Sequence, residues 1–449
     1  MAVLSPIRPP PTQREEKTGE ASVMCDSSTA EPRVDRRSWY MLGILVLVYI
    51  MGSVDRAVPS VVVEPLKREF DLSDAQIGVL TGFAYSIPYA LAALPGGWLL
   101  DRLDRRRFLA FTTVVWSVLT MAGAAVQNYV ALLLARMGVG ASEAPASPGS
   151  LSLISDLFPR ERRGTAVSLY YAGTAVGQFI TFMVGGWLLM HFGWRSLFLI
   201  AGVPGLVLAA LLVFTCKEPE RGRFDPPSAE GPRRAVSYTV AARWILRSRP
   251  LLHSIWGNML STGVQFSVMV WTVSFLVRIH GLTPERAAIW VGLGIGLMQT
   301  LGSLLAGPVT DRFSRGESAR LALVPATFTV LAALTGVAMC LAPTLTAALV
   351  AMAVFAVLVG GVVGPGYATL VSFTEPHMRG SVLSIAKLFS ILIGNGVLSF
   401  MTGKLSDMIG TPDSIRWALA ATLLFHLWAA FHFWRASRAA QRIAANNSA

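Results

Sequence analysis

The stretch GGWLLDRLDRRRF at residues 96–108 ends a long apolar run in a dense group of charges. A related stretch, GPVTDR at residues 307–312, ends another apolar run 210 residues later. In both, a glycine is followed four residues later by Asp-Arg. The match indicates that the two halves of the chain are copies of one another.

The composition indicates a membrane protein. Of the 449 residues, 53% are hydrophobic and only 14% are charged, whereas ordinary soluble domains carry about 25% charged residues. The three cysteines, Cys25, Cys216 and Cys340, are scattered singly. Neither a disulfide framework nor a thiolate metal site is expected from them.

Twelve apolar stretches reach the roughly 20 residues that a helix needs to cross about 30 Å of hydrocarbon. They lie at about 39–63, 75–100, 107–126, 129–156, 165–190, 194–216, 251–279, 286–310, 320–342, 345–374, 381–405 and 415–435. The sequence therefore predicts an all-α integral membrane protein with two six-helix bundles.

These stretches divide the chain into five regions. We expect a disordered cytoplasmic tail at 1–38, a first bundle at 39–216, a polar cytoplasmic linker at 217–250, a second bundle at 251–435 and a cytoplasmic tail at 436–449. The first region has no apolar core of the kind that signal peptides carry, so no cleavable signal is expected.

The net charge of +12 is explained by topology. Most Lys and Arg residues outside the apolar stretches fall on one side of the predicted helix order, as the positive-inside rule requires. We therefore expect a multi-pass plasma-membrane protein, in the inner membrane if the source is bacterial, with both termini in the cytoplasm. Nucleic acid is not an expected partner.

A second repeated motif fixes the relation between the halves. Pro148-Gly149 precedes Pro159 by the interval that separates Pro365-Gly366 from Pro376, and Arg-Gly follows in both copies. An even number of crossings lies between the copies, so both halves have the same orientation. Parallel six-helix repeats describe the major-facilitator architecture.

Several motifs carry a family resemblance. The 96–108 loop resembles the major-facilitator loop signature, although Asp104 stands where that signature has its second glycine. MGSVDRAVPSVV (51–62), LLLARMGVGASEAPASP (132–148) and LISDLFPRERRGTAVSLYYAG (153–173) resemble the Spinster-type lipid transporters. LIGNGVLSFMTGKLSD (392–407) is similar to the family, but has Ser399-Phe400 where Gly-Pro is common.

Charges within the predicted helices are the first candidates for function, because a charge there costs from about 2.5 kcal/mol upward. Asp55 and Arg56 lie in the first helix, Arg136 and Glu143 in the fourth, and Lys387 in the eleventh. Arg136 and Glu143 are seven residues apart, so they share one helix face. An ion pair between these charges is one interpretation of this spacing.

The repeat supplies an internal comparison for these charges. The counterparts of Asp55, Arg56, Arg136 and Glu143 in the second half are Gln265, Phe266, Ala353 and Gly360. A purely structural cluster that fixes the first helix against the fourth is one explanation. Because the second half folds without these charges, a coupling role in the first half is favoured.

The family resemblance implies the same role, because the matching Asp-Arg pair and fourth-helix Glu of the Spinster family are thought to handle protons and substrate. We expect protonation of Glu143 to release its partner, Arg136 or Arg56, and to let the bundles rock. Lys387 is expected either to receive an anionic substrate or to extend its side chain to the cytoplasmic edge.

The cytoplasmic helix ends carry a second set of candidates. Their charges can latch neighbouring helix ends together and bias which side is open, with Asp156 paired to Arg163 and Glu375 to Arg379. The predicted gating residues are Gly97, Asp101, Arg102, Arg106, Asp156, Arg163, Gly307, Asp311, Arg312, Glu375 and Arg379.

The predicted function is secondary active transport of an amphiphilic or anionic small molecule, lysophospholipid-like or sphingoid-phosphate-like, with protons as the coupling ion. The alternatives are an uncoupled facilitator, a small organic-anion symporter and a transport-dead receptor or scaffold. The six histidines lack metal-ligand spacing, and the Gly-rich VGLGIGLMQTLG (291–302) lies in an apolar helix. We therefore expect no metal, no cofactor and no enzymatic activity, and a monomer surrounded by membrane lipid.

The topology can be tested with single cysteines in a cysteine-free background. A membrane-impermeant thiol reagent applied to intact cells should label the 64–74 loop and leave a cysteine at Ser228 unlabelled, because the linker faces the cytoplasm. Labelling at Ser228 would contradict the twelve-span topology.

Overall fold

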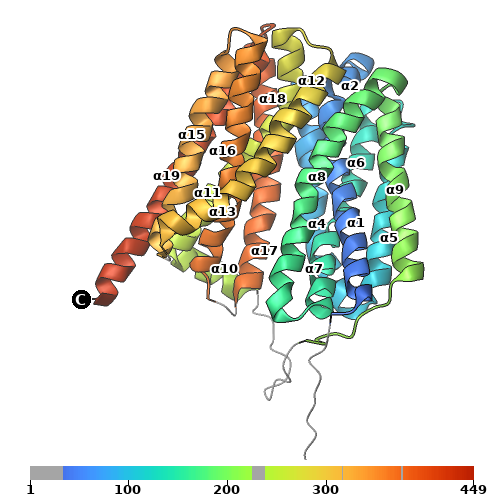
Figure 1. Ribbon diagram of the computed structural model, residues 1–449. Coiled ribbons are helices and arrows are strands. Elements are labelled where there is room, and N and C mark those ends of the chain that lie inside the picture. The colour runs from blue at the N-terminus through green and yellow to red at the C-terminus, as the bar shows by residue number, and fades with distance from the viewer. Residues whose placement is uncertain (1–33, 225–237, 316, 376–377, 449) are drawn as a thin grey trace, which may run out of the picture. The chain divides into compact units, whose positions relative to one another are not determined.

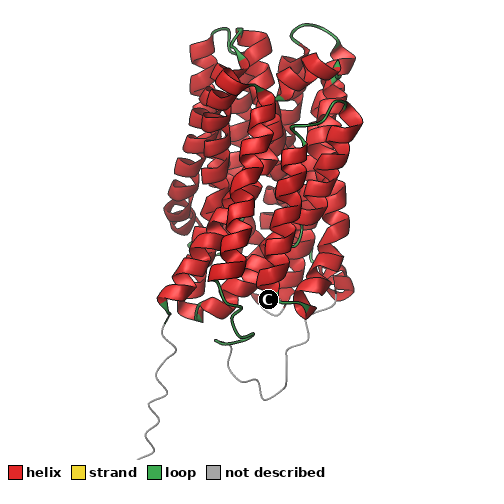
Figure 2. Ribbon diagram, turned by 90° about the vertical axis from the view of Figure 1, so that its right-hand side faces the viewer, coloured by secondary structure: helices red, strands yellow, loops and turns green. Residues whose placement is uncertain are grey.

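The twelve apolar stretches all fold as helices in the computed structural model, which describes residues 34–224, 238–315, 317–375 and 378–448 (Figure 1). Figure 2 shows that every regular element of these residues is helical and that loops lie at the two ends of the helices. The described residues belong to one compact unit. The predicted all-α membrane fold is confirmed.

The first bundle contains six crossings. They are α1 (Arg36–Val61), the continuous α3 (Asp74–Gly78), η1 (Val79–Phe83) and α4 (Ala84–Arg102), then α5 (Arg105–Ala122), the pair α6 (Tyr129–Glu143) and α7 (Ala146–Leu157), α8 (Arg160–Phe192), and α9 (Trp194–Thr215). A short helix, α2 (Val63–Phe70), lies in the connection between the first two.

The second bundle repeats this order after a short helix, α10 (Tyr238–Arg247). Its crossings are α11 (Arg249–His280), then α12 (Pro284–Val291) with η2 (Gly292–Leu297) and α13 (Met298–Ser314), α14 (Ser318–Leu321) with α15 (Leu323–Leu341), α16 (Leu345–Ser372), α17 (Arg379–Phe389) with η4 (Ser390–Val397) and α18 (Leu398–Ile409), and α19 (Ser414–Ser448).

Among the described residues, ten helices are long and apolar enough to span a membrane by themselves. The other two expected crossings are α5, which begins with three arginines, and the pair α6 and α7. The predicted span at 129–156 consists of two helices, because the helix breaks at Ala144 and Pro145. Proline has no backbone N–H to donate and its ring displaces the preceding turn.

Some region boundaries also differ from the prediction. Helix α1 begins at Arg36, while residues 1–33 of the predicted tail lie outside the described part. The linker at 217–250 contains α10, whose Ala241 and Ile245 are buried. The 436–449 region continues α19 as far as Ser448, because its Ala-rich sequence favours helix.

Three stretches of π-helix lie where the two bundles meet. A Cβ at Gly82 in η1 would lie 2.7 Å from the carbonyl oxygen of Gly396 in η4. In η2, Gly292 packs against the side chain of Phe182 in α8. Such widened turns are rare and concentrate at functional sites. Here they bring backbones of opposite bundles together.

Polar contacts between the bundles are concentrated at one end of the molecule. Among the described residues, most hydrogen bonds and ion pairs that join the two bundles lie near the start of α3 and the ends of α11 and α18. Two hydrogen bonds lie elsewhere: one at mid-helix between Thr81 and Ser399, and one from Lys387 to Ser147. The end that the charge distribution assigns to the outside is therefore closed.

Candidate functional site

Glu143 is the centre of the charged cluster in the first bundle. Its carboxylate forms an ion pair with Arg56 of α1 and accepts a hydrogen bond from the Tyr85 hydroxyl of α4, with a distance of 2.9 Å between the oxygens. The Glu143 side chain is 5% exposed and that of Arg56 is 24% exposed. One acid on α6 therefore joins three helices, and its cationic partner remains partly accessible.

A glycine makes room for this carboxylate. A Cβ at Gly52 in α1 would lie 2.6 Å from Oε1 of Glu143 and 3.5 Å from an Arg56 nitrogen. Real Cβ atoms essentially never lie within 3.0 Å of another heavy atom. Glycine at position 52 therefore leaves room for the Glu143 carboxylate beside α1.

Arg136 has a different partner from the one expected. Its Nη1 donates to the backbone carbonyl of Asp55 at 3.0 Å, and its guanidinium lies 5.7 Å from the centre of the Tyr85 ring. Of the two expected partners of Glu143, Arg56 forms the ion pair and Arg136 does not. Arg136 and Glu143 thus both lie on the face of α6 that meets α1, as their spacing predicts.

Asp55 is the most enclosed acid of the cluster. Asp55 is 1% exposed, and its Oδ1 has no hydrogen-bond partner in the described part of the chain. Arg136 supplies its largest attractive charge interaction and Arg56 a smaller one. The cluster therefore holds two acids and two arginines in one bundle.

Lys387 faces this cluster from the second bundle. Its Nζ donates to the Ser147 hydroxyl of α7 at 3.3 Å and lies 6.0 Å from the centre of the Tyr171 ring. The Arg56 guanidinium lies 5.9 Å from the centre of the Tyr49 ring, and the Tyr49 and Tyr171 rings are 5.6 Å apart. Two cations from opposite bundles therefore border one cluster of tyrosines.

The second bundle is closed at the position that corresponds to Glu143. A Cβ at Gly360 in α16 would collide with the backbone carbonyl of Gln299 in α13. The counterpart of Arg136, Ala353, lacks a charge as well. The charged cluster is thus confined to one bundle, as the comparison of the repeats predicted.

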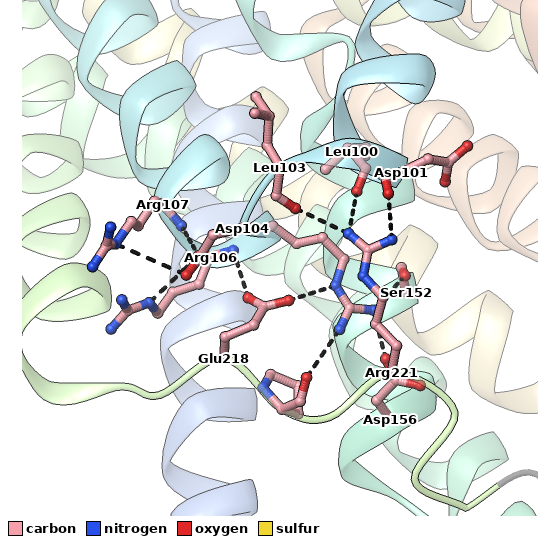
Figure 3. A network of polar contacts seen from close by, with 12 residues as sticks. Leu100, Asp101, Leu103, Asp104, Arg106, Arg107, Ser152, Asp156, Glu218 and Arg221 are labelled. Carbon is pink, nitrogen blue, oxygen red and sulfur yellow. Dashed lines mark hydrogen bonds and ion pairs between the residues drawn. The ribbon is translucent and has the colours of Figure 1, made fainter.

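The inner end of the first bundle holds a polar network around Arg105 (Figure 3). Arg105 is 3% exposed; its Nη1 donates to Asp156 at 2.5 Å and to Ser152 at 2.8 Å, and its Nε donates to Glu218 at 2.7 Å. The pairing of Asp156 with Arg163 is not observed. Arg163 donates through Nη2 to the backbone carbonyl of Ser155 instead.

Two further arginines close the network from the sides. The backbone N–H of Arg106 donates to Glu218 at 2.9 Å, and its Nη1 donates to the Val213 carbonyl at 2.9 Å. Arg221 donates to the carbonyls of Leu100 and Asp101 at the end of α4. Figure 3 shows the Asp101 carboxylate pointing away from this network, and it is exposed with no ion pair to a described residue.

The remaining predicted gating residues lie at exposed or open positions. A Cβ at Gly97 or Gly307 would meet nothing within 4 Å. The Arg102 guanidinium lies 3.9 Å from the centre of the Trp98 ring, and Arg379 donates to the Thr374 carbonyl at 3.4 Å. At the helix ends of the second bundle, the side chains of Asp311, Arg312 and Glu375 are exposed.

Sequence reasoning missed an outer network that joins the bundles. Arg278 at the end of α11 donates to both carboxylate oxygens of Asp74 at 2.7 and 2.8 Å, and to Glu64 at 2.9 Å. The Ser406 hydroxyl of α18 donates to Asp74 at 2.6 Å. Lys67 forms another ion pair with Asp74. The available signal in the sequence was Arg278, which lies on the side of the predicted topology that has few basic residues and several acids.

Asp407 completes this network by capping a helix of the other bundle. Its two carboxylate oxygens accept the backbone N–H groups of Asp74 at 2.9 Å and Ala75 at 2.7 Å. The Ser73 side chain accepts the N–H of Gln76. These are the first amides of α3, which have no partner within their own helix.

Comparison with known proteins agrees with this geometry. Residues 45–392, more than half of the chain, match the sequence profile of the Major Facilitator Superfamily. The chain belongs to this superfamily. It is therefore a multi-pass membrane transporter and not an enzyme.

A solved structure extends the similarity of this facilitator to the predicted branch. A bacterial homologue of the human lysosomal transporter Spinster, in an inward-facing and unoccupied conformation, is 27% identical with a TM-score of 0.83; the match covers 91% of this chain and 98% of that one. A D-xylose-proton symporter at 20% identity and a TM-score of 0.68 shares the fold. The resemblance inferred from the motifs is confirmed.

Two relatives in sequence are also transporters. An "MFS-type efflux pump" of Mycolicibacterium smegmatis is 28% identical over 92% of this chain and 95% of its own length. A "probable galactarate/D-glucarate transporter" of Bacillus subtilis is 26% identical over 61% of this chain, which spans 64% of that relative. The facilitator therefore has relatives with different stated roles.

We expect the outer network to influence the balance between the inward-open and outward-open states of this facilitator. Arg278→Gln removes the ion pairs that tie α11 to α3, so the outward-open population should rise by roughly 5- to 150-fold, the range of typical allosteric couplings. Distances between spin labels at the outer ends of the two bundles, measured by pulsed electron paramagnetic resonance, report this balance.

Arg195→Gln is the matched control. Arg195 pairs with Glu69 within the first bundle, and its hydrogen bond lowers the pKa of Glu69. This variant also removes one outer arginine, but it should leave the distances unchanged. Equal distances for Arg278→Gln and the parent would contradict a gating role for the outer network.

Proposed function

We propose that this facilitator is a proton-coupled transporter of an organic anion that works by alternating access. The observation that carries the proposal is the position of Glu143, whose carboxylate holds Arg56 while Arg56 remains 24% exposed. A proton on Glu143 removes the negative charge that holds Arg56. Proton binding therefore frees a cation for the substrate, so that proton and anion favour each other's binding.

Lys387 supplies the second contact for the anion. Arg56 belongs to the first bundle and Lys387 to the second, and each lies over a tyrosine ring, Tyr49 and Tyr171, whose centres are 5.6 Å apart. An anion that contacts both cations attracts the two bundles to each other. Since a ligand shifts a conformational equilibrium only by its differential affinity, this shared contact links substrate binding to the change of access.

The proposed substrate is an amphiphile with an anionic head, a lysophospholipid or a sphingoid phosphate. The resemblance of the sequence motifs to the Spinster-type lipid transporters supports this class, and Tyr171 near Lys387 offers an apolar ring beside a polar hydroxyl. A small organic acid is the second candidate, because a relative is named for galactarate and glucarate. The two classes share the anionic group and differ in the tail.

Asp101 is proposed to act in the outward-open state. Its carboxylate is exposed and has no ion pair with a described residue while the outer end is closed. Loss of its charge can therefore weaken only an arrangement in which it has a partner. We further propose a monomer in the inner membrane of a bacterium, with both termini in the cytoplasm.

The role of Asp101 gives a directional prediction. Asp101→Asn keeps the size of the side chain and should raise the ratio of inward-open to outward-open protein by roughly 5- to 150-fold, the direction opposite to that of Arg278→Gln. The same spin-label distances measure it. Substrate affinity in a cross-linked single state should not change, and a loss of binding there would contradict the latch.

Glu143→Gln tests proton coupling. Glutamine keeps the volume and can still hydrogen-bond Arg56 and Tyr85, but it cannot release a proton. In vesicles with a pH difference of one unit, the parent can accumulate substrate by up to about tenfold for each proton, whereas the variant should only equilibrate it. Radiolabelled lysophosphatidate and galactarate are supplied in parallel to separate the two substrate classes.

Glu161→Gln, at an exposed acid near the start of α8, is the matched control and should accumulate substrate as the parent does. Exchange without a pH difference should persist in Glu143→Gln, which shows that the variant is folded. Gradient-driven accumulation by Glu143→Gln equal to that of the parent would exclude Glu143 as the coupling group.

A further inference from the structure

A second polar cavity lies far along the chain from the charged cluster, at the end of the second bundle where α11 begins and α19 ends. Its volume is about 460 Å³. The end of α10, the start of α11 and the last turns of α19 form its walls. Figure 1 shows α10 and the C-terminal end at the same end of the bundle. The charge distribution assigns this end to the cytoplasm.

The cavity is strongly cationic. The arginines in its wall are Arg247, Arg249, Arg435, Arg438 and Arg442. No Asp or Glu lines it, and none of the five arginines forms an ion pair with a residue in the described part of the chain. Their charges are therefore available to an external anion.

The start of α11 adds to this field. Ser248, its N-cap residue, lines the cavity together with Arg249, and the Ser248 side chain makes no capping hydrogen bond. The first amides of a helix lack partners within the helix and carry partial positive charge; in α11 these are the amides of Arg249 and Leu251, because Pro250 has no N–H. Together with the arginines, they suit a group with several acceptor oxygens, such as a phosphate.

Tryptophans place the cavity beside the membrane surface. Trp434 lines the cavity and is 45% exposed, and Trp256 and Trp428 stack nearby with ring centres 6.4 Å apart. Exposed tryptophans on membrane proteins gather at the level of the lipid headgroups. The arginines are therefore within reach of headgroup phosphates while apolar rings face the lipid tails.

We propose that this cavity binds the phosphate of an anionic phospholipid from the cytoplasmic leaflet. Basic pockets at the cytoplasmic ends of membrane helices are suited to such headgroups. Because α10 precedes the second bundle and α19 is its last helix, the bound lipid would hold these two segments together at this end. The site is separate from the substrate site and does not depend on the proposed transport function.

The test compares lipid binding by the purified full-length protein. Native mass spectrometry in detergent gives the affinity for dioleoylphosphatidylglycerol and for the zwitterionic dioleoylphosphatidylcholine. The double variant Arg438→Gln with Arg442→Gln should weaken phosphatidylglycerol binding by roughly thirtyfold, if each arginine contributes as a basic residue does at an anionic membrane surface. Phosphatidylcholine binding should be weaker and unaffected.

Two control pairs separate charge from structure. The double variant Arg162→Gln with Arg315→Gln removes two exposed arginines that do not line the cavity. This variant should bind lipid as the parent does. Arg438→Lys with Arg442→Lys keeps both charges and should retain most of the affinity. If the lysine pair binds as weakly as the glutamine pair, positive charge is not the cause and the proposal fails.

The remaining outcomes are also decisive. Equal phosphatidylglycerol affinity for the parent and the Arg438→Gln, Arg442→Gln variant would overturn the site. Inorganic phosphate at millimolar concentration should not displace the lipid. If it does so while the protein shows no preference for phosphatidylglycerol over phosphatidylcholine, the cavity is a free-phosphate site and the lipid assignment is wrong.

Discussion

The cost of placing a charge in hydrocarbon determines where polar groups occur in this transporter. Charged side chains that lie within the membrane must be paired, because isolated ones are expensive there. Helix ends carry most of the charges, in an inner network around Arg105 and an outer one around Arg278. The cluster of Glu143 and Arg56 is the costly exception, and it occurs in one bundle only. That asymmetry is the basis for the coupling role that we propose for the first bundle.

Close backbone contact is the second determinant of the structure. Lipid gives little hydrophobic drive for helices to associate, so small residues that allow close approach become important. Gly82 meets Gly396 across the bundle interface, and Gly52 admits the Glu143 carboxylate against α1. In the second bundle, Gly360 brings α16 against α13 at the position where the first bundle holds its acid. The same space is thus used for packing in one repeat and for chemistry in the other.

The fold could be predicted from sequence because helices of transmembrane length produce long apolar runs that nothing else explains. The position of the site could also be predicted, since Asp55 and Glu143 are conspicuous inside such runs. Its pairing could not: Arg56 and Arg136 are both candidate partners of Glu143, and a seven-residue spacing within α6 does not show which of them the carboxylate reaches. Tyr85 was missed because a tyrosine in an apolar helix is ordinary, and Asp74 because charges at helix ends are expected.

The cap that Asp407 provides to α3 has a consequence for the secondary structure itself. The first two amides of α3 are satisfied by a residue of the opposite bundle, and loss of a helix cap costs about 0.5–2 kcal/mol. When the bundles separate on this side, the first turn of α3 loses that support and becomes prone to fraying. Closure of the transporter and completion of one of its helices are thus a single event, so hydrogen exchange at these amides would follow the transport cycle.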